Sequence, residues 1–190
     1  MRVIAGVAKG TRLTAPRQGA RPTTDRVREA VFSSLVDWAG RSGDPPAAQL
    51  AGLSVLDLFA GSGAVAIEAA SRGAARAVAV DAAASAVSAI QANVHRAGVD
   101  VQVVRATVQH FLRGSPPDGG FDIVWLDPPY ESDIDFLTHL GGWVASDGLV
   151  AVERSARTPA PDWPPRFANA WAKRYGETMV YFAEAQEGVT

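Results

Sequence analysis

Three aspartates stand at positions where their carboxylates could meet a ligand. Asp57 lies in an apolar run just before a glycine turn, Asp81 ends a second apolar run, and Asp127 directly follows a third. Short apolar runs of this kind are typical of strands buried on both faces of a parallel sheet. Because open α/β sheets bind ligands outside the carboxyl ends of their strands, the spacing predicts that these aspartates face one site.

The last of these aspartates begins the sequence D-P-P-Y, which is suited to binding an amine. Two prolines remove two N–H donors and fix two φ angles, so the loop is rigid and its carbonyls are free to accept hydrogen bonds. Asp127 and the carbonyl of Pro128 could each accept one N–H of an exocyclic base amine, and an aromatic ring follows to stack on the base. An ordinary structural turn is the alternative, but the position at a strand end favours function. The predicted catalytic residues are therefore Asp127, Pro128, Pro129 and Tyr130.

The glycine turn lies between a strand over residues 54–59 and a helix over residues 64–71, which is the first half of a βαβ unit. Glycines let the backbone approach a ligand closely, and the helix start behind them presents free N–H groups. Gly61, Gly63 and Ala66 also fit the dinucleotide pattern G-x-G-x-x-[GA], so the turn alone leaves a nicotinamide or flavin enzyme open. The predicted cofactor contacts in this unit are Asp57, Phe59, Ala60, Gly61, Ser62 and Gly63.

A further cofactor contact is predicted at the end of the next strand. Asp81 follows the glycine turn at about the twenty-residue distance at which an acid reaches the ribose hydroxyls of an adenosine ligand. Dinucleotides and other adenosine cofactors share that ribose, so Asp81 does not distinguish between them.

Composition and length set the bounds on the protein class. The chain has 190 residues, of which 47% are hydrophobic and 20% charged, as expected of one soluble α/β domain. There are no cysteines, which excludes disulfides and thiolate chemistry, and the three histidines are scattered without ligand spacing, so we expect no metal. No apolar run is long enough to span a membrane and no signal peptide is evident, so the cytoplasm is the expected compartment.

Positive charge is concentrated at the beginning of the chain. Residues 1–28 hold seven basic residues and one acidic residue, although the formal net charge of the whole chain is -2. A basic arm on an acidic body is a common feature of nucleic-acid-binding proteins. Residues 2–5 and 12–15 alternate in polarity around two glycines and predict a β-hairpin. The residues predicted to bind RNA are Arg2, Lys9, Arg12, Arg17 and Arg21.

The rest of the chain predicts a doubly wound α/β fold. The sequence Thr23-Thr24-Asp25 supplies N-cap candidates for a helix that runs to about Trp38. Strands and helices then alternate, and the last two strands form an antiparallel hairpin that turns at Gly176. We therefore expect a basic β-hairpin extension over residues 1–22 and a Rossmann-like domain over residues 23–190. Its sheet should have seven mostly parallel strands with helices on both faces.

Two long phrases carry a family resemblance. R-V-I-A-G-V-A-K-G-T-R-L followed by R-P-T-T-D-R-V-R-E-A-V-F, together with D-L-F-A-G-S-G and D-P-P-Y, resembles the bacterial small-subunit (16S) ribosomal RNA guanine-N2 methyltransferases. The resemblance covers nearly the whole chain and implies a class I methyltransferase that transfers a methyl group from S-adenosylmethionine to one guanine N2. It also implies, as partner, 16S rRNA within the 30S subunit or an assembly intermediate.

The resemblance adds cofactor contacts beyond those of the glycine turn. In this family the stretch from residue 21 to residue 32 would lie beside the cofactor, which adds Thr23 and Arg26. Many methyltransferases place an acid after the third strand to meet the adenine amine. This chain has Ala106 and Thr107 there instead, so the family pattern predicts adenine recognition through backbone groups at these two positions.

Three alternatives remain at this stage. A DNA adenine-N6 methyltransferase shares D-P-P-Y, but it usually needs a target-recognition region, and no such insertion is visible. A nicotinamide-dependent oxidoreductase would fit the glycine turn. A non-catalytic ribosome-assembly factor would keep the fold without the chemistry, which the intact D-P-P-Y disfavours. We expect a monomer.

Overall fold

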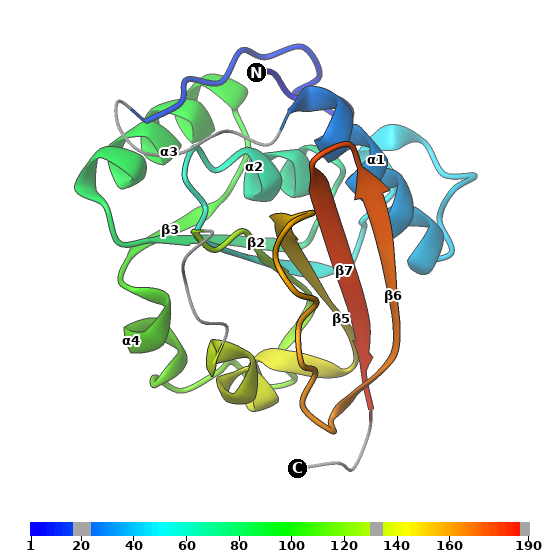
Figure 1. The fold of residues 1–190 in the computed structure, drawn as a ribbon. Helices are drawn as coiled ribbons and strands as arrows, with labels where there is room; N and C mark the ends of the chain where they lie inside the picture. The colour runs from blue at the N-terminus through cyan, green and yellow to red at the C-terminus, as the bar shows by residue number, and fades with distance from the viewer. Residues whose placement is uncertain (17–23, 130–134, 187–190) are drawn as a thin grey trace.

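The protein folds around one seven-stranded sheet with the strand order β3-β2-β1-β4-β5-β7-β6 (Figure 1). The structure is a computed structural model that describes residues 1–16, 24–129 and 135–186. Strands β1 to β5 are parallel, and β7 is antiparallel to both of its neighbours. The predicted Rossmann-like fold is confirmed. The strands are β1 (Ser54–Leu58), β2 (Arg76–Asp81), β3 (Gln102–Arg105), β4 (Phe121–Leu126), β5 (Val144–Ser155), β6 (Phe167–Tyr175) and β7 (Thr178–Ala185).

Helices cover both faces of the sheet, because the central strands are apolar on both sides. Three longer helices pack on one face, and a short α-helix with two 3₁₀ helices packs on the other (Figure 1). The hydroxyl of Thr24 accepts a hydrogen bond from the backbone of Val27, so the predicted N-cap is confirmed. The helices are α1 (Asp25–Trp38), η1 (Pro46–Ala48), α2 (Ala64–Ser71), α3 (Ala84–Ala97), α4 (Val108–Leu112), η2 (Asp135–His139) and η3 (Gly141–Trp143).

The strand order reverses between β1 and β4, and this position creates the site. Val55 of β1 pairs with Ala77 of β2 on one side and with Ile123 of β4 on the other. Helices that follow strands on opposite sides of such a point diverge, which leaves a crevice at the carboxyl ends of the strands. Asp57 lies near the carboxyl end of β1, Asp81 is the last residue of β2, and Asp127 directly follows β4.

The N-terminal arm, residues 1–16, folds back on itself as the small hairpin expected at the start of the chain. It contains one antiparallel bridge, between Arg2 and Arg12, with backbone hydrogen bonds on either side of it. Val3, Ala8 and Leu13 are buried and pack in one cluster with α2 and α3. The apolar residues of the arm are thus part of the hydrophobic core, because they cover the surface of these two helices.

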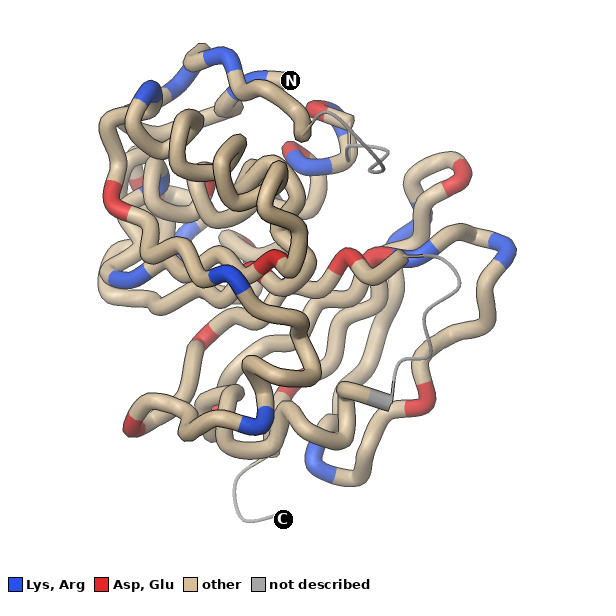
Figure 2. Tube along the Cα trace, turned by 90° about the vertical axis from the view of Figure 1, so that its left-hand side faces the viewer, with Lys and Arg blue, Asp and Glu red and all other residues tan. Residues whose placement is uncertain are grey.

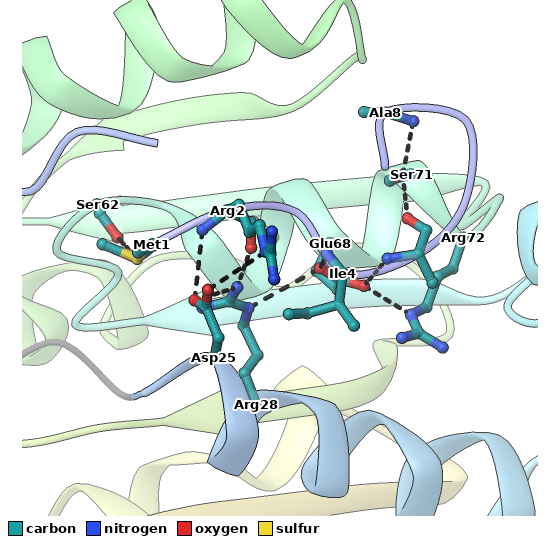
Figure 3. Close-up of polar contacts among 12 residues, drawn as sticks. Met1, Arg2, Ile4, Ala8, Asp25, Arg28, Ser62, Glu68, Ser71 and Arg72 are labelled. Carbon is teal, nitrogen blue, oxygen red and sulfur yellow. Dashed lines mark hydrogen bonds and ion pairs between the residues drawn. The ribbon is translucent and has the colours of Figure 1, made fainter. Parts of the chain in front are cut away.

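Polar contacts also fix the arm to α2. The carboxylate of Glu68 accepts hydrogen bonds from the backbone N–H groups of Ile4 and Ala5, at 2.7 and 2.9 Å. Gly6 has a φ of 81°, and a Cβ there would lie 1.8 Å from the carbonyl oxygen of Ser71. Figure 3 shows Glu68 between the arm, Arg28 of α1 and Arg72, which follows α2. These contacts fix the arm in one position on the domain.

Strand β5 begins at Val144, which pairs with Phe121 of β4 across an irregularity in the register. The segment Asp135–His139 forms the 3₁₀ helix η2. Within the described residues, no helix has the length and hydropathy needed to cross a membrane.

Candidate active site

The carboxyl ends of β1, β2, β4 and β5 surround a cavity of about 510 Å³, a volume in the range of small-ligand sites. All three predicted aspartates line it, together with most of the other predicted contacts. The predicted residues in its wall are Asp57, Phe59, Ala60, Gly61, Ser62, Asp81, Thr107, Asp127, Pro128 and Pro129. Acidic positions gather near the centre of the molecule in the turned view (Figure 2).

Other predicted residues lie elsewhere. Gly63 and Ala106 are next to the cavity in sequence but are not among its described lining residues. Arg26 is exposed and does not line it. Four predicted positions fall outside the described residues, and these are Arg17, Arg21, Thr23 and Tyr130.

The glycine turn is shaped by backbone conformation and by close packing. Phe59 has a φ of 64°, which is unusual for a residue with a side chain and brings the chain sharply out of β1. Gly63, the N-cap of α2, has a φ of 75°, and a Cβ there would lie 2.9 Å from Cγ2 of Ile90 on α3. Glycine is therefore needed at position 63 for helix packing as well as for the turn.

Asp81 holds the turn against the end of β2. Its carboxylate accepts hydrogen bonds from the backbone N–H groups of Gly61 and Ala83, at 2.9 and 2.8 Å. These bonds leave further lone pairs on both oxygens, so the side chain is fixed in place and can still accept hydrogen bonds from a ligand.

Asp57 is buried beneath the turn, and its pKa is strongly raised. Burial raises the pKa from its ordinary value to about 7, the hydrogen bond from the backbone of Ala66 opposes this, and the nearby charge of Asp81 adds to it. The hydrogen bond from Ala66, at 3.1 Å, fixes the carboxylate to the first turns of α2. Ionised Asp57 would favour a cationic ligand group in the cavity.

We expect Asp57→Asn to weaken the pH dependence of stability. Because the pKa in the folded state is raised to about 7, the contribution of Asp57 is fully present below the pKa of the unfolded chain and is lost as the pH rises through about 7. The free energy of unfolding of the cofactor-free protein, measured by denaturant titration at about pH 5 and about pH 8, should fall less in Asp57→Asn than in the wild type. Asp100→Asn, at an exposed position, should behave as the wild type. An unchanged pH dependence in Asp57→Asn would contradict the raised pKa.

A second carboxylate, which sequence reasoning missed, accompanies Asp127. Glu153 of β5 is buried and lines the same cavity. Burial raises the pKa of Asp127 well above its ordinary value, and the charges of Glu153 and then Asp57 raise it further. Glu153 ends an apolar run at a strand end, as Asp81 does, and that pattern could have identified it.

One buried cation, Arg28, also lines the cavity, whereas the sequence pointed to Arg26, two residues earlier. Arg28 has an exposed fraction of only 1%, and its Nη2 donates to Asp25 and to the carbonyl of Arg2. Its Nε lies 3.8 Å from a carboxylate oxygen of Glu68, but neither Nε nor Nη1 has a hydrogen-bond partner among the residues that the structure describes. The side chain extends from α1 toward the arm (Figure 3). Residues two apart lie on opposite sides of a helix, so Arg26 faces solvent and Arg28 faces inward, toward the arm and α2.

The basic residues of the arm lie on its outer side. Arg2, Lys9 and Arg12 are exposed, whereas Val3 and Ala8, which lie between them in sequence, are buried. Basic positions recur along this segment beside the N-terminus in the turned view (Figure 2). Met1, Ala15 and Pro16 line the cavity, so the arm borders the candidate active site directly.

The sheet order, the antiparallel β6–β7 pair, the glycine turn after β1 and the acid at the end of β2 together define a class I S-adenosylmethionine-dependent methyltransferase. A model of the family described as "Conserved hypothetical protein 95" matches residues 1–184. The chain belongs to this family. It is 33% identical to Ribosomal RNA small subunit methyltransferase D of Escherichia coli strain K12, over 98% of this chain and 91% of the relative.

Solved structures agree with this family relationship. A hypothetical protein of Thermus thermophilus superposes with a TM-score of 0.79 at 31% identity, over 97% of this chain and 99% of the other. An RNA methyltransferase from Salinibacter ruber in complex with S-adenosyl-L-homocysteine superposes with a TM-score of 0.63, over 89% of this chain and 96% of the other. At 17% identity the second likeness concerns the fold alone. The methyltransferase resemblance expected from the sequence is confirmed.

Proposed function

We propose that this protein transfers a methyl group from S-adenosylmethionine to the exocyclic N2 of one guanine in small-subunit ribosomal RNA. The observation that carries the proposal is the single cavity that joins the glycine turn to Asp127-Pro128-Pro129 and borders the basic arm. The family relationship supports it, because the E. coli relative is named as a ribosomal RNA small subunit methyltransferase. The proposed substrate is 16S rRNA in the 30S subunit or an assembly intermediate, and the protein acts as a cytoplasmic monomer without a metal.

The charges of the cavity favour S-adenosylmethionine over a dinucleotide. Four carboxylates line it, from Asp57, Asp81, Asp127 and Glu153, and Arg28 is the one cationic side chain among its described lining residues. A dinucleotide would bring two phosphate charges into this acidic site, at a high electrostatic cost. S-adenosylmethionine has a positive sulfonium and ammonium and one negative carboxylate, which matches the observed balance.

Each part of the cofactor has a candidate partner in this chain. Arg28 would bind the carboxylate of the amino-acid end through Nη1, because a buried N–H group without an acceptor is costly and a carboxylate would satisfy it. Asp81 would accept the ribose hydroxyls. The small residues of the turn would lie against the adenosine, where larger side chains would block it.

The residues after β4 would position the amine that receives the methyl group. The bound cofactor supplies an electrophilic methyl group on its sulfonium. The carboxylate of Asp127 and the carbonyl of Pro128 would each accept one N–H of the guanine amine, which orients the nitrogen lone pair. Asp127 would also stabilise the positive charge that develops on nitrogen. Most of the rate enhancement would then come from positioning and electrostatics.

The decisive experiment is nucleoside analysis of small-subunit rRNA from cells with and without this protein. We expect N2-methylguanosine at one position to disappear in its absence and to return when purified protein and S-adenosylmethionine are added to the unmethylated particles. Calorimetry should detect binding of S-adenosylmethionine and none of NAD. An unchanged nucleoside profile, or binding of NAD alone, would refute the proposal.

We expect the arm to contribute phosphate contacts that salt weakens. Replacing Lys9 and Arg12 with glutamine should reduce affinity for the particle and lower the slope of log affinity against log salt by about one to two, because each phosphate contact contributes about 0.7–0.9. Filter binding over a range of salt concentrations measures the slope. Replacing the exposed Arg113 and Arg174 in the same way is the matched control and should leave it unchanged. Equal slopes for the two double variants would show that the arm does not contact RNA.

A further inference from the structure

Glu153 lies beside Asp127 in the candidate active site. Leu126 of β4 pairs with Val152 of β5 in parallel register, so the next residue of each strand extends the same row. Both Asp127 and Glu153 line the cavity, and only 7% of Glu153 is exposed. Neighbouring parallel strands lie about 4.8 Å apart, which places two acidic residues next to each other at the point where the substrate amine would enter.

Two adjacent buried carboxylates favour a ligand that carries N–H donors. Burial opposes the ionisation of Asp127 and the charge of Glu153 adds to this, which is the reason that the pKa of Asp127 is raised. Positive groups or several N–H donors lower the cost of such a pair. A ligand with an array of N–H donors on one edge would therefore bind well at this position.

Guanine has such an array on one edge. Its N1 carries one N–H and its neighbouring N2 amine carries two, so three donors need three acceptors. Asp127 and the carbonyl of Pro128 account for the two N–H groups of the amine under the proposed function, on which this step rests. We infer that Glu153 is the third acceptor and receives the N1–H of the target guanine.

This contact would determine which base is methylated. Adenine and 2,6-diaminopurine have a lone pair at N1, which would face the carboxylate of Glu153 and be repelled. A site built to bind a donor rejects an analogue without that donor strongly, because its buried acceptor is then left without a partner. Glu153 therefore favours guanine and disfavours adenine, even though D-P-P-Y alone would accept an amine on either base.

The test uses 2,6-diaminopurine, which retains the reactive amine at C2 but lacks the N1–H. Small-subunit particles are reconstituted with rRNA that contains either guanine or 2,6-diaminopurine at the methylated position. The measured quantity is kcat/KM on each particle for the wild type, Glu153→Gln and the control Glu184→Gln. Glu184 is also a strand glutamate, but it lies on β7 and is not among the described residues of the cavity wall.

We expect the wild type and Glu184→Gln to prefer guanine by about 100-fold or more. Glu153→Gln should lose about 10- to 100-fold on guanine, which corresponds to one base-edge contact. It should also lose most of the preference, because the amide of glutamine can donate an N–H to the lone pair at N1. Its affinity for S-adenosylhomocysteine, measured by calorimetry, should stay within about threefold of the wild type and shows that the variant is folded.

Two results would overturn the inference. The first is a Glu153→Gln variant that binds S-adenosylhomocysteine and keeps the wild-type preference for guanine. The second needs no variant, since a wild-type enzyme that methylates 2,6-diaminopurine as fast as guanine does not read N1. Failure of the wild type to methylate any guanine would instead refute the proposed function, so the two failures are distinguishable.

Discussion

Replacement of Asp127 with asparagine is expected to reduce kcat by about 10²- to 10³-fold, the usual loss when one transition-state hydrogen-bond partner is removed. Asparagine preserves the shape of the side chain but removes its negative charge. The amine would then be oriented less well, and the positive charge that develops on its nitrogen would no longer be stabilised by a carboxylate. The raised pKa of Asp127 adds a second expectation, because activity should fall on acidification at a pH above the ordinary range of a carboxyl group.

Single-turnover methylation of undermethylated particles measures this effect without interference from product release. Affinity for S-adenosylhomocysteine and for the particle should change little in Asp127→Asn, since the proposed cofactor contacts of Arg28 and Asp81 are intact. Asp122→Asn is a matched control on the same strand, because Asp122 binds Ser54 at the opposite end of β4. Turnover in Asp127→Asn close to that of the wild type would exclude the proposed role.

The second large effect is expected on stability, from Glu68→Ala. Glu68 is fully buried on α2 and accepts hydrogen bonds from Ile4, Ala5 and Arg72, with Arg28 as a further ion-pair partner. Removing the carboxylate deprives two buried guanidinium groups of a negative partner and two backbone N–H groups of their hydrogen-bond acceptor. Loss of one partner from a buried ionic network typically costs about 3–5 kcal/mol, a large share of the stability of a domain.

Denaturant unfolding measures this loss, and hydrogen exchange locates it. The amides of Ile4 and Ala5 should exchange faster in Glu68→Ala, because their acceptor has gone. Glu29→Ala, at an exposed position on α1, is the control and should change the free energy of unfolding by less than about 0.5 kcal/mol. A stable Glu68→Ala protein with protected arm amides would show that the arm is held by its apolar residues alone.

The central fold and part of the site could be predicted from sequence because their determinants are local. The apolar run that ends at Leu58, the turn at Gly61 and Gly63 and the acid at Asp81 each specify a strand, a turn or a strand end within a few residues. Parallel order then brings the strand ends together without any further information. The same logic correctly located Asp127 at the edge of the cavity.

The features that were missed depend on packing between distant segments. The helical pattern of α1 does not specify which arginine is buried, and only the packed helix shows that Arg28 is buried and Arg26 is exposed. The charge of the arm suggested an exposed extension. Val3 and Leu13 instead pack against apolar residues of α2 and α3, which are distant from the arm in sequence. Pattern alone does not reveal which surface an amphipathic segment will cover.

The position of Arg28 has a thermodynamic consequence for the order of binding. One side of its guanidinium donates to the carbonyl of Arg2 in the arm, while Nη1 has no hydrogen-bond partner in the described part of the chain and the side chain lines the cavity. If a cofactor carboxylate binds there, it shares one cation with the segment proposed to contact RNA, so the two binding equilibria are linked. Such linkage is reciprocal. The factor by which bound cofactor changes the affinity for RNA therefore equals the factor by which bound RNA changes the affinity for the cofactor.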